Sequence, residues 1–398
     1  MKYRIDAKSG NKLSVLGFGC MRFPIGINAK IDVNKSEDIV LSAVERGVNY
    51  FDSAYNYAGS EQALGEILKR NPGVRTKIHI ATKLPLGLCK SYEDFEKIFN
   101  TQLERLQTDH IDYYLIHALS CAADWYEIRK LDVEKWLSEK KLSGQIRQIG
   151  FSFHGIQNEF VKLLDEYAWD FCMIQYNYIN ENYQAGRGGL IQAHKRGLPI
   201  MIMEPLLGGK LATGLPKRAV KALRDADGSR QPAEWALRWL WDQPEVTLAL
   251  SGMNSKTQLN ENIRAAESAE PHMLSEDEKT AINKVVGIFG ESYKIPCTGC
   301  NYCLPCPQDV NIPGSFAAYN IYYSTGRITG YTQYILGTCA VKPEKNFSGK
   351  HCVKCGKCEK ACPQQIRIAN ELETVVKKME PFWFNTFMKI ARSRDLKI

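Results

Sequence analysis

The segment "GVNYFDSAYNYAGSEQALGEILKR" (residues 47–70) contains the unit from which the fold of most of the chain is built. Its apolar run "VNYFD" (48–52) ends in an acid, and a loop rich in tyrosine and glycine follows. In "SEQALGEILKR" (60–70) the apolar residues recur at intervals of three and four, as on one face of a helix. The segment therefore predicts a buried strand, a polar loop and an amphipathic helix.

The same alternation of strand and helix continues on both sides of this segment. The helix expected from "SEDIVLSAVERG" (36–47) begins with Ser36 as N-cap and ends at Gly47, and Pro232 is placed to open "PAEWALRWLWDQ" (232–243). "YEDFEKIFNTQLERL" (92–106) repeats the helical pattern. The eight expected strands are "VLGFGC" (15–20), "VNYFD" (48–52), "IHIATK" (78–83), "IDYYLIH" (111–117), "QIGFS" (148–152), "FCMIQYN" (171–177), "PIMIMEP" (199–205) and "VTLALSG" (246–252).

Eight strand–helix units within about 240 residues predict a closed barrel. Continuous apolar strands that alternate with helices indicate a parallel sheet covered on its outer side. An open Rossmann-type sheet is the main structural alternative, but no G-x-G-x-x-G follows the first strand. We therefore expect an α/β fold, a (β/α)8 TIM barrel, over residues 1–285.

Polar side chains stand where the expected strands end. Barrel enzymes place their chemistry at the carboxyl ends of the strands, so an acid, a lysine, a histidine and an amide at one rim indicate an active site. The residues at these ends are Asp52, Lys83, His117, Ser152, Gln175, Glu204 and Ser251.

Several of these segments resemble the aldo/keto reductase family, in the family's order along the chain. They are "GVNYFDSAYNYAGSEQALGE" (47–66), "IATK" (80–83), "DYYLIHAL" (112–119), "IGFSFHG" (149–155), "QYNYIN" (175–180), "EPLLGGKL" (204–211) and "SGMNSKTQLNENI" (251–263). The resemblance implies reduction of a small carbonyl substrate, or the reverse oxidation of an alcohol, with a catalytic tetrad. That tetrad falls on Asp52, Tyr57, Lys83 and His117.

The chemistry of this tetrad is consistent with carbonyl reduction. Hydride transfer to a carbonyl needs a proton for the developing alkoxide, which Tyr57 would supply as general acid. A neighbouring ammonium, Lys83, lowers the pKa of a tyrosine, and Asp52 would hold that lysine charged. His117 would orient the carbonyl oxygen. Taken singly, each residue also has a structural interpretation: a core histidine, a buried ion pair, or packing tyrosines.

The resemblance also implies a nicotinamide cofactor, NADP(H), lying across the same rim. It places Ser152 and Gln175 near the carboxamide, the loop from Leu206 to Lys210 near the pyrophosphate, and residues 251–262 near the adenosine. The individual positions are Ser152, Gln175, Leu206, Gly208, Lys210, Ser251, Gly252, Lys256, Glu261 and Asn262. Met203 replaces the aromatic residue that often stacks on the nicotinamide, and Lys256 and Arg264 are the only bases where a basic pair usually marks a 2′-phosphate. The choice between NAD and NADP therefore stays open.

Nine of the thirteen cysteines lie between residues 297 and 362. "CVKCGKCEKACP" (352–363) has the C-x2-C-x2-C-x3-C-P spacing of bacterial ferredoxins, and "CTGCNYCLPCP" (297–307) is one residue shorter. Such spacing favours iron–sulfur clusters over disulfides, and over zinc, whose ligands usually come as two separated pairs. We expect two [4Fe–4S] clusters in a small α+β ferredoxin-like domain, residues 286–398. Resemblance to two-cluster ferredoxins implies crossed ligation, with one set formed by Cys297, Cys300, Cys303 and Cys362, and the other by Cys352, Cys355, Cys358 and Cys306.

Three further features of this region lead to expectations. Residues 311–336 are aromatic and predict a helical insert between the two cysteine runs. Cys339 lies outside both runs and is expected to be a packed thiol, and residues 379–398 form an amphipathic tail expected to pack onto the body of the protein. From residue 341 to 398 the chain has 13 lysines and arginines against 6 acids. This basic charge fits a solvated surface, an anionic cluster, or an acidic redox protein as a partner.

Other classes of protein are disfavoured. No basic and aromatic motif typical of nucleic-acid binding accompanies the net charge of +8, and no apolar run is long enough to span a membrane. The first ten residues lack the apolar core of a signal peptide, so a cytoplasmic location is expected. Three functional hypotheses remain: a reductase whose clusters exchange electrons with the barrel site, a carbonyl reductase with structural or redox-sensing clusters, and an electron-transfer protein whose barrel is a scaffold.

Overall fold

The structure is a computed structural model of the 398-residue chain and describes residues 1–27, 30–338, 347–382 and 384. Contacts divide the chain into two compact units. The first, here called the barrel unit, consists of Met1–Leu206 and Ala233–Ser275. The second, the cluster unit, consists of Leu207–Pro232 and Glu276–Ile398, and contains the two cysteine runs. Two separate stretches of the chain thus contribute to each unit.

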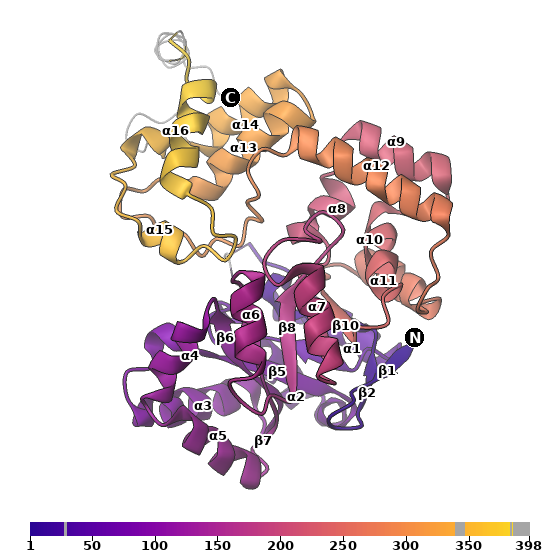
Figure 1. The fold of residues 1–398 in the computed structure, drawn as a ribbon, viewed down its shortest axis with the longest axis vertical. Helices are drawn as coiled ribbons and strands as arrows, with labels where there is room; N and C mark the ends of the chain where they lie inside the picture. The colour runs from indigo at the N-terminus through magenta and orange to yellow at the C-terminus, as the bar shows by residue number, and fades with distance from the viewer. Residues whose placement is uncertain (28–29, 339–346, 383, 385–398) are drawn as a thin grey trace. The chain divides into compact units, whose positions relative to one another are not determined.

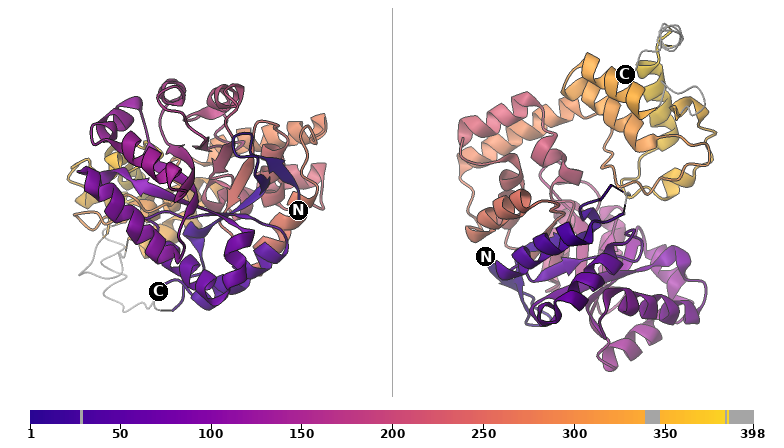
Figure 2. Two further views of the ribbon diagram at one scale, coloured as in Figure 1. Left: turned by 90° about the horizontal axis from the view of Figure 1, so that it is seen from below. Right: turned by 180° about the vertical axis from the view of Figure 1, so that it is seen from behind.

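The barrel unit contains a closed eight-stranded barrel, as the sequence predicts. Its parallel strands are hydrogen-bonded in the order β10-β3-β4-β5-β6-β7-β8-β9, so no strand has a free edge. Helices surround the strands on the outside (Figures 1 and 2). The strands are β3 (Leu16–Gly19), β4 (Tyr50–Asp52), β5 (His79–Pro85), β6 (Ile111–Leu119), β7 (Ile146–Phe153), β8 (Phe171–Gln175), β9 (Ile200–Met203) and β10 (Leu248–Ser251). This closure excludes the open Rossmann-type alternative.

Alternate residues of the strands supply two apolar cores. Side chains that point inward, such as Tyr113, Phe171 and Met201, fill the interior of the barrel. Side chains that point outward, such as Ile80 and Ile116, pack under the helices. Because both faces of each strand are buried, the strand sequences are continuously apolar instead of alternating.

The helices of the barrel unit include the four that the sequence predicts, at 36–47, 60–70, 92–106 and 232–243, with similar bounds. The helices of this unit are α1 (Val33–Glu45), α2 (Ser60–Arg70), α3 (Tyr92–Leu106), α4 (Ala122–Arg129), α5 (Val133–Leu142), α6 (Gln157–Leu164), α7 (Gly186–Lys195), α10 (Pro232–Trp241) and α11 (Lys256–Glu267). The prediction of Ser36 as an N-cap is wrong. Asp32 caps α1 and accepts from the Lys35 backbone N–H, while Ser36 is buried one turn inside and donates its hydroxyl to the Asp32 carbonyl. Gly47 follows this helix with a φ of 89°, as expected for a helix end.

A short antiparallel hairpin that the sequence analysis missed precedes the first barrel strand. It consists of β1 (Tyr3–Ile5) and β2 (Lys12–Ser14). Leu13 packs into the barrel interior, and Asp6 accepts a 2.7 Å hydrogen bond from the Tyr113 hydroxyl. Tyr113 lies near the start of β6, so the hairpin covers the amino-terminal end of the barrel, opposite the polar strand ends.

The cluster unit is built from helices in the part that the structure describes. They are α8 (Lys210–Thr213), α9 (Lys217–Ala226), α12 (Glu276–Ser292), α13 (Ile312–Ser324), α14 (Arg327–Gly337), α15 (Lys357–Lys360) and α16 (Ile368–Met379), with 3-10 turns η4 (Leu207–Gly209) and η5 (Gly349–His351). The predicted helical insert is therefore confirmed as α13 and α14, which lie side by side (Figure 1). Cys339 and most of the predicted tail fall outside the described residues.

A small apolar core holds the cluster unit together near the cysteines. Phe316, Tyr334, Leu372 and Val375 are among its buried members, and six of the eight ferredoxin-type cysteines pack against it. The thiols therefore form part of the wall of this core. None of the described helices is long and apolar enough to cross a membrane.

Candidate active site and cluster site

A buried ion pair lies at the carboxyl ends of two adjacent strands. Asp52 is the last residue of β4, and Lys83 lies on the neighbouring strand β5. The Lys83 Nζ donates to both carboxylate oxygens of Asp52 at 2.8 and 2.7 Å, and to the backbone carbonyl of Ser53 at 2.6 Å. The Lys83 residue is only 1% exposed. Its ammonium therefore has a fixed position and three oxygen partners.

Burial sets the electrostatics of this pair. Burial raises the pKa of the Asp52 carboxyl, and the charge of Lys83 and its hydrogen bonds oppose that shift. Neither group is well solvated, so each compensates the charge of the other. Removing one partner of a buried pair would leave the second charge without compensation.

Tyr57 lies in the loop after β4, close to the ion pair. The centroid of its ring is 4.9 Å from the Lys83 Nζ, and its ring meets the His117 ring edge to face at a centroid distance of 6.1 Å. The tyrosine is partly buried, whereas Asp52, Lys83 and His117 are buried. The structure thus brings together the four residues predicted as a tetrad.

His117 is a buried, neutral imidazole. Burial lowers its pKa well below the usual value, and the charge of Lys83 and the neighbouring His154 lower it further. The next residue, Ala118, has a left-handed φ of 59°, and its backbone N–H donates to the Ser152 hydroxyl at 2.8 Å. Ser152 therefore helps to fix the backbone that carries His117, a local role that its position at a strand end did not indicate.

Three buried residues near the tetrad, His154, Glu61 and Gln102, were not identified from the sequence. His154, directly after β7, is 8% exposed, and burial lowers its pKa to about 4. Glu61 and Gln102 are buried on α2 and α3, where Gln102 donates to the Lys83 carbonyl at 3.0 Å and to Glu61 at 3.0 Å. The position of His154 right after a strand could have identified it. Helical periodicity could have identified the other two, because Glu61 has helical spacing to Leu64 and Leu68, and Gln102 has it to Ile98 and Leu106.

Gln175, at the end of β8, has a feature that fits a nicotinamide. It is fully buried, and neither its side-chain oxygen nor its nitrogen has a hydrogen-bond partner in the structure. A buried amide without partners is costly, because both its donor and its acceptor have lost water. The carboxamide of a nicotinamide offers one donor and one acceptor of matching type. The residue predicted to meet the carboxamide therefore has the hydrogen-bonding capacity for it.

The positions predicted near the adenosine lie around the end of β10 and the start of α11. Asn262 donates its side-chain N–H to the Ser251 hydroxyl at 2.9 Å, so these two predicted residues contact each other. Lys256 is the first residue of α11, and its exposed ammonium is 3.3 Å from Asp38. Glu261 is partly buried on the same helix, and a Cβ added at Gly252, the residue after Ser251, would lie 3.2 Å from the Arg22 side chain.

The loop predicted to lie near the pyrophosphate has its last residues in the cluster unit. Leu206 packs on the outer core of the barrel unit, whereas Gly208, with a φ of 66°, and Lys210 belong to the cluster unit. The Lys210 ammonium donates to the backbone carbonyl of Cys297 and lies 5.0 Å from the centroid of the Tyr293 ring. Within the cluster unit, a positive charge is thus held against the first residue of the first cysteine run.

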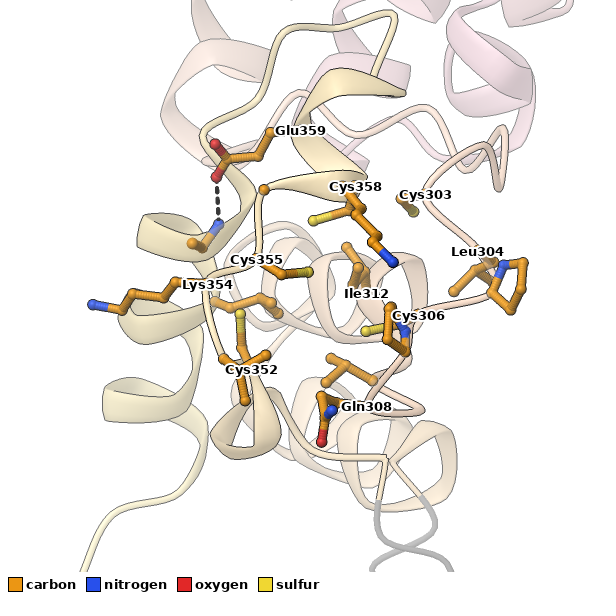
Figure 3. Close-up of a pocket in the computed structure, with 18 of the residues that line it drawn as sticks. Cys303, Leu304, Cys306, Gln308, Ile312, Cys352, Lys354, Cys355, Cys358 and Glu359 are labelled. Atoms are coloured by element: carbon orange, nitrogen blue, oxygen red, sulfur yellow. Dashed lines mark hydrogen bonds between the residues drawn. The ribbon is translucent and has the colours of Figure 1, made fainter. Parts of the chain in front are cut away.

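Five cysteines of the cluster unit line one cavity. It has a volume of about 230 Å³, and its walls include Cys303 and Cys306 from the first run and Cys352, Cys355 and Cys358 from the second. The sulfur atoms of the last four point toward the cavity, and Cys303 lies at its edge (Figure 3). These four are the set expected from crossed ligation.

The other four cysteines form a second group. Burial raises the pKa of the Cys303 thiol to about 12, and the neighbouring sulfurs of Cys297, Cys300 and Cys362 raise it further. Burial also raises the pKa of Cys362, whose sulfur neighbour is Cys297. The last cysteine of the second run therefore lies with the first three of the first run, which is the complementary crossed set.

The arrangement suits clusters in which each iron takes one thiolate. A [4Fe–4S] cluster binds four cysteines at four different irons, so its ligands surround a cavity instead of a point. Along 1–27, 30–338, 347–382 and residue 384, no three histidine, cysteine or acidic side chains are close enough to hold a single metal ion.

Comparison with protein families agrees with these two sites. The model of the aldo/keto reductase family matches residues 15–286, more than half of the chain. The chain belongs to the aldo/keto reductase family. A 4Fe-4S dicluster domain matches residues 296–367. The protein is therefore an oxidoreductase that combines an aldo/keto reductase barrel with a ferredoxin-like iron–sulfur domain. This family supports binding of a nicotinamide cofactor in the barrel.

The individual relatives are distant and match the barrel part of this aldo/keto reductase. A 6-dehydroglucose reductase from Novosphingobium aromaticivorans is 28% identical over 289 residues, 66% of this chain and 90% of the relative. An L-glyceraldehyde 3-phosphate reductase from Escherichia coli is 24% identical over 67% of this chain and 87% of its own. The solved holo structure of the aldo-keto reductase AKR11C1 from Bacillus halodurans is 27% identical, with a TM-score of 0.59, over 72% of this chain and 96% of that one.

Proposed function

We propose that the barrel reduces a small carbonyl compound, or oxidises the corresponding alcohol, with Tyr57 as the general acid. The observation that carries this proposal is the convergence of Tyr57 and His117 on the buried pair formed by Asp52 and Lys83. A purely structural ion pair would not need a partly exposed tyrosine beside its ammonium. The bound nicotinamide cofactor would supply the hydride.

Each residue of the tetrad would then have a distinct task. Tyr57 donates its hydroxyl proton to the oxygen of the carbonyl as negative charge develops there. The Lys83 ammonium, 4.9 Å from the ring centroid, stabilises the phenolate that remains. Asp52 holds the ammonium in place. The neutral imidazole of His117 donates a hydrogen bond to the carbonyl oxygen without losing a proton.

We further propose that the cofactor is NADP(H), held by Ser152, Gln175, Ser251, Gly252, Lys256, Glu261 and Asn262, with Leu206, Gly208 and Lys210 as the pyrophosphate residues. The unpartnered Gln175 amide supports the nicotinamide end. At the other end, Lys256 brings an exposed ammonium to the first turn of α11, where a helix N-terminus also favours an anion such as a 2′-phosphate.

In the cluster unit, we propose that the eight thiols hold two [4Fe–4S] clusters in crossed sets. One is held by Cys306, Cys352, Cys355 and Cys358, the other by Cys297, Cys300, Cys303 and Cys362. Bound clusters supply one-electron transfer, whereas a nicotinamide passes two electrons as a hydride. We propose an acidic redox protein as the partner that exchanges single electrons with the clusters. We retain residues 1–285 and 286–398 as the two functional domains.

The names of two relatives suggest which substrates to test first. A 6-dehydroglucose reductase and an L-glyceraldehyde 3-phosphate reductase are both named for polar, sugar-derived carbonyl compounds. We propose that this chain also acts on a small polar carbonyl compound. The two named carbonyl compounds, tested with NADPH and with NADH, form a rational initial panel.

The test compares Tyr57→Phe with Tyr55→Phe in anaerobically purified protein. Tyr55 lies in the same loop, but its ring faces the Arg105 guanidinium at 4.2 Å instead of Lys83. We expect Tyr57→Phe to lower kcat by a factor of roughly 10²–10⁴ with little change in nicotinamide affinity, and Tyr55→Phe to retain activity. Full activity in Tyr57→Phe would remove the general-acid assignment. An unchanged rate of electron transfer through the clusters, with no carbonyl reduction by the wild type, would favour the electron-transfer alternative.

A further inference from the structure

The two cysteine sets differ in their access to the protein surface. Cys355, which faces the cavity, is exposed, whereas Cys297, Cys300, Cys303 and Cys362 are all partly buried. The Lys210 ammonium additionally contacts the backbone carbonyl of Cys297. A redox group in the cavity beside Cys355 would therefore lie closer to solvent than one held by the other set.

Exposed apolar residues border this cavity on both cysteine runs. Val353 is 61% exposed and Leu304 is 40% exposed, and both are part of the cavity wall. They lie next to cysteines in the sequence, so their exposure places apolar surface directly over the ligand loops. Exposed apolar groups beside a polar rim are typical of a protein interaction site.

Basic residues surround the apolar patch. Lys354, Lys357 and Lys360 are exposed, and the Lys354 side chain points away from the cavity (Figure 3). Two acids nearby have partners: the Glu359 carboxylate accepts from the Ala369 backbone N–H at 2.8 Å, and Glu373 pairs with Lys354. The second cysteine run itself contains three lysines and one glutamate, so its surface is positively charged.

We propose that this surface, formed by Leu304, Val353, Lys354, Lys357 and Lys360 and here called the Cys355 surface, docks a small acidic one-electron carrier protein. The inference rests on the proposed clusters. It extends that proposal by assigning the docking surface and the cluster that exchanges electrons first. That cluster is the one held by Cys306, Cys352, Cys355 and Cys358. Small apolar centres with charged rims suit transient redox complexes, in which charge complementarity speeds association.

The proposed reaction transfers a single electron. The reduced carrier loses one electron and the oxidised cluster beside Cys355 gains it, with no bond made or broken. The second cluster, held by the less exposed cysteines, receives the electron from the first. The positive surface would attract an acidic carrier and repel a basic one.

The experiment uses the full chain with both clusters and an acidic two-cluster ferredoxin as the carrier. Reduced ferredoxin is mixed with the oxidised protein in a stopped-flow instrument at low and at high ionic strength, and the affinity of the two oxidised proteins is measured by calorimetry. The test variant is Lys354→Glu with Lys357→Glu and Lys360→Glu. The control is Lys69→Glu with Lys90→Glu and Lys97→Glu, which makes the same charge change at exposed residues of the barrel unit.

We expect the test variant to lose about tenfold or more in the second-order rate at low salt, with a matching loss of affinity, and the control to change much less. The wild-type rate should fall as salt rises. Reduction by the methyl viologen radical, a small cation, should not slow in the test variant, because it needs no acidic docking partner.

Three results would overturn the proposal: an equal loss in both variants, a wild-type rate that is independent of salt, or equal slowing with methyl viologen. Iron and sulfide analysis shows whether the protein holds the two proposed clusters, and so distinguishes an error in the docking proposal from an error in the cluster proposal. Protein with two clusters and no salt-dependent docking would contradict only the Cys355 surface. Protein without clusters would contradict both proposals, and Tyr57→Phe tests the barrel chemistry independently of either.

Discussion

The barrel rim and the cysteine-lined cavity are organised for chemistry in different ways. At the rim, protein contacts hold the polar groups in place: Lys83 has three oxygen partners, and Ser152 fixes the backbone after His117. In the cavity, thiols from both cysteine runs form the wall, and burial raises the pKa of Cys358. The rim is thus preorganised by packing, whereas we expect the cysteine module to depend on bound clusters as well as on its apolar core. Four predictions test this difference.

The largest effect is expected from removing a thiol that faces the cavity. In Cys358→Ala, one cluster loses a ligand, so iron content should fall to about half and the cluster unit should become easier to unfold and to cleave with protease. The barrel unit should retain its own thermal transition. Cys121→Ala, in the barrel unit, is the control and should keep full iron content. Loss of the barrel transition in Cys358→Ala would mean that the rim also depends on the clusters.

The second prediction concerns the buried ion pair at the rim. Lys83→Met leaves Asp52 charged and without a partner, so the free energy of unfolding of the barrel unit should fall by about 3–5 kcal/mol. Adding Asp52→Asn to Lys83→Met should restore part of the lost free energy of unfolding. Lys256→Met breaks an exposed pair with Asp38 and should cost at most about 1 kcal/mol. Denaturant unfolding measures all three, and equal costs for the buried and exposed pairs would contradict the preorganised rim.

The third prediction is a pH dependence confined to the rim. Burial lowers the pKa of His154 to about 4, against about 6.5 in an unfolded chain. Between these values the unfolded state binds a proton that the folded state does not, so stability falls as pH decreases from about 6.5 toward 4. The slope attributable to one such histidine is at most about 1.4 kcal/mol per pH unit.

The test of this dependence is barrel unfolding at pH 7 and pH 5 in three proteins. His154→Gln should reduce the loss of stability at pH 5, relative to the wild type. His194→Gln, at an exposed position of α7, should leave that loss unchanged. An identical pH dependence in His154→Gln and in the wild type would show that His154 does not stay neutral in the folded barrel.

The smallest expected effect is a change in cluster potential. The Lys210 ammonium contacts the Cys297 carbonyl, so Lys210→Gln removes a positive charge beside one cluster. Reduction adds negative charge, and the midpoint potential of that cluster should fall by some tens of millivolts, given that roughly 59 mV corresponds to 1.4 kcal/mol for one electron. A redox titration monitored by electron paramagnetic resonance measures the midpoint potential of each cluster. Lys217→Gln, an exposed position on α9, should leave both potentials in place.

Local sequence patterns predicted the features that depend on short stretches of chain. Strand positions followed from apolar runs, and the convergence of Asp52, Lys83 and His117 followed from the rule that parallel strands end at one rim. The hairpin β1–β2 was missed because its strands have three residues each. Asp32 was overlooked as a cap because Ser36, a good capping residue by type, follows it one turn later.

Features that depend on tertiary contacts were not visible in the sequence. The spacing places Glu61 and Gln102 on the apolar faces of their helices, but it does not reveal their partners: Gln102 donates to Glu61 and to the Lys83 carbonyl. Likewise, nothing in the sequence near Lys210 indicates that its ammonium reaches a cysteine 87 positions later. Such contacts arise only when distant segments fold against each other.

The composition of the cluster unit from two stretches of chain has a consequence for dissecting the protein. Helix α9, which follows strand β9 in the sequence, packs against α12, and Arg230 after α9 pairs with Glu278 on α12. A gene shortened at residue 286, where the barrel family match ends, would cut α12 and remove α13 onward. One shortened before α12 would leave the apolar side of α9, including Leu223, facing water. No single stop codon can yield one unit cleanly, so recombining these units between proteins requires three junctions, after residues 206, 232 and 275, instead of one.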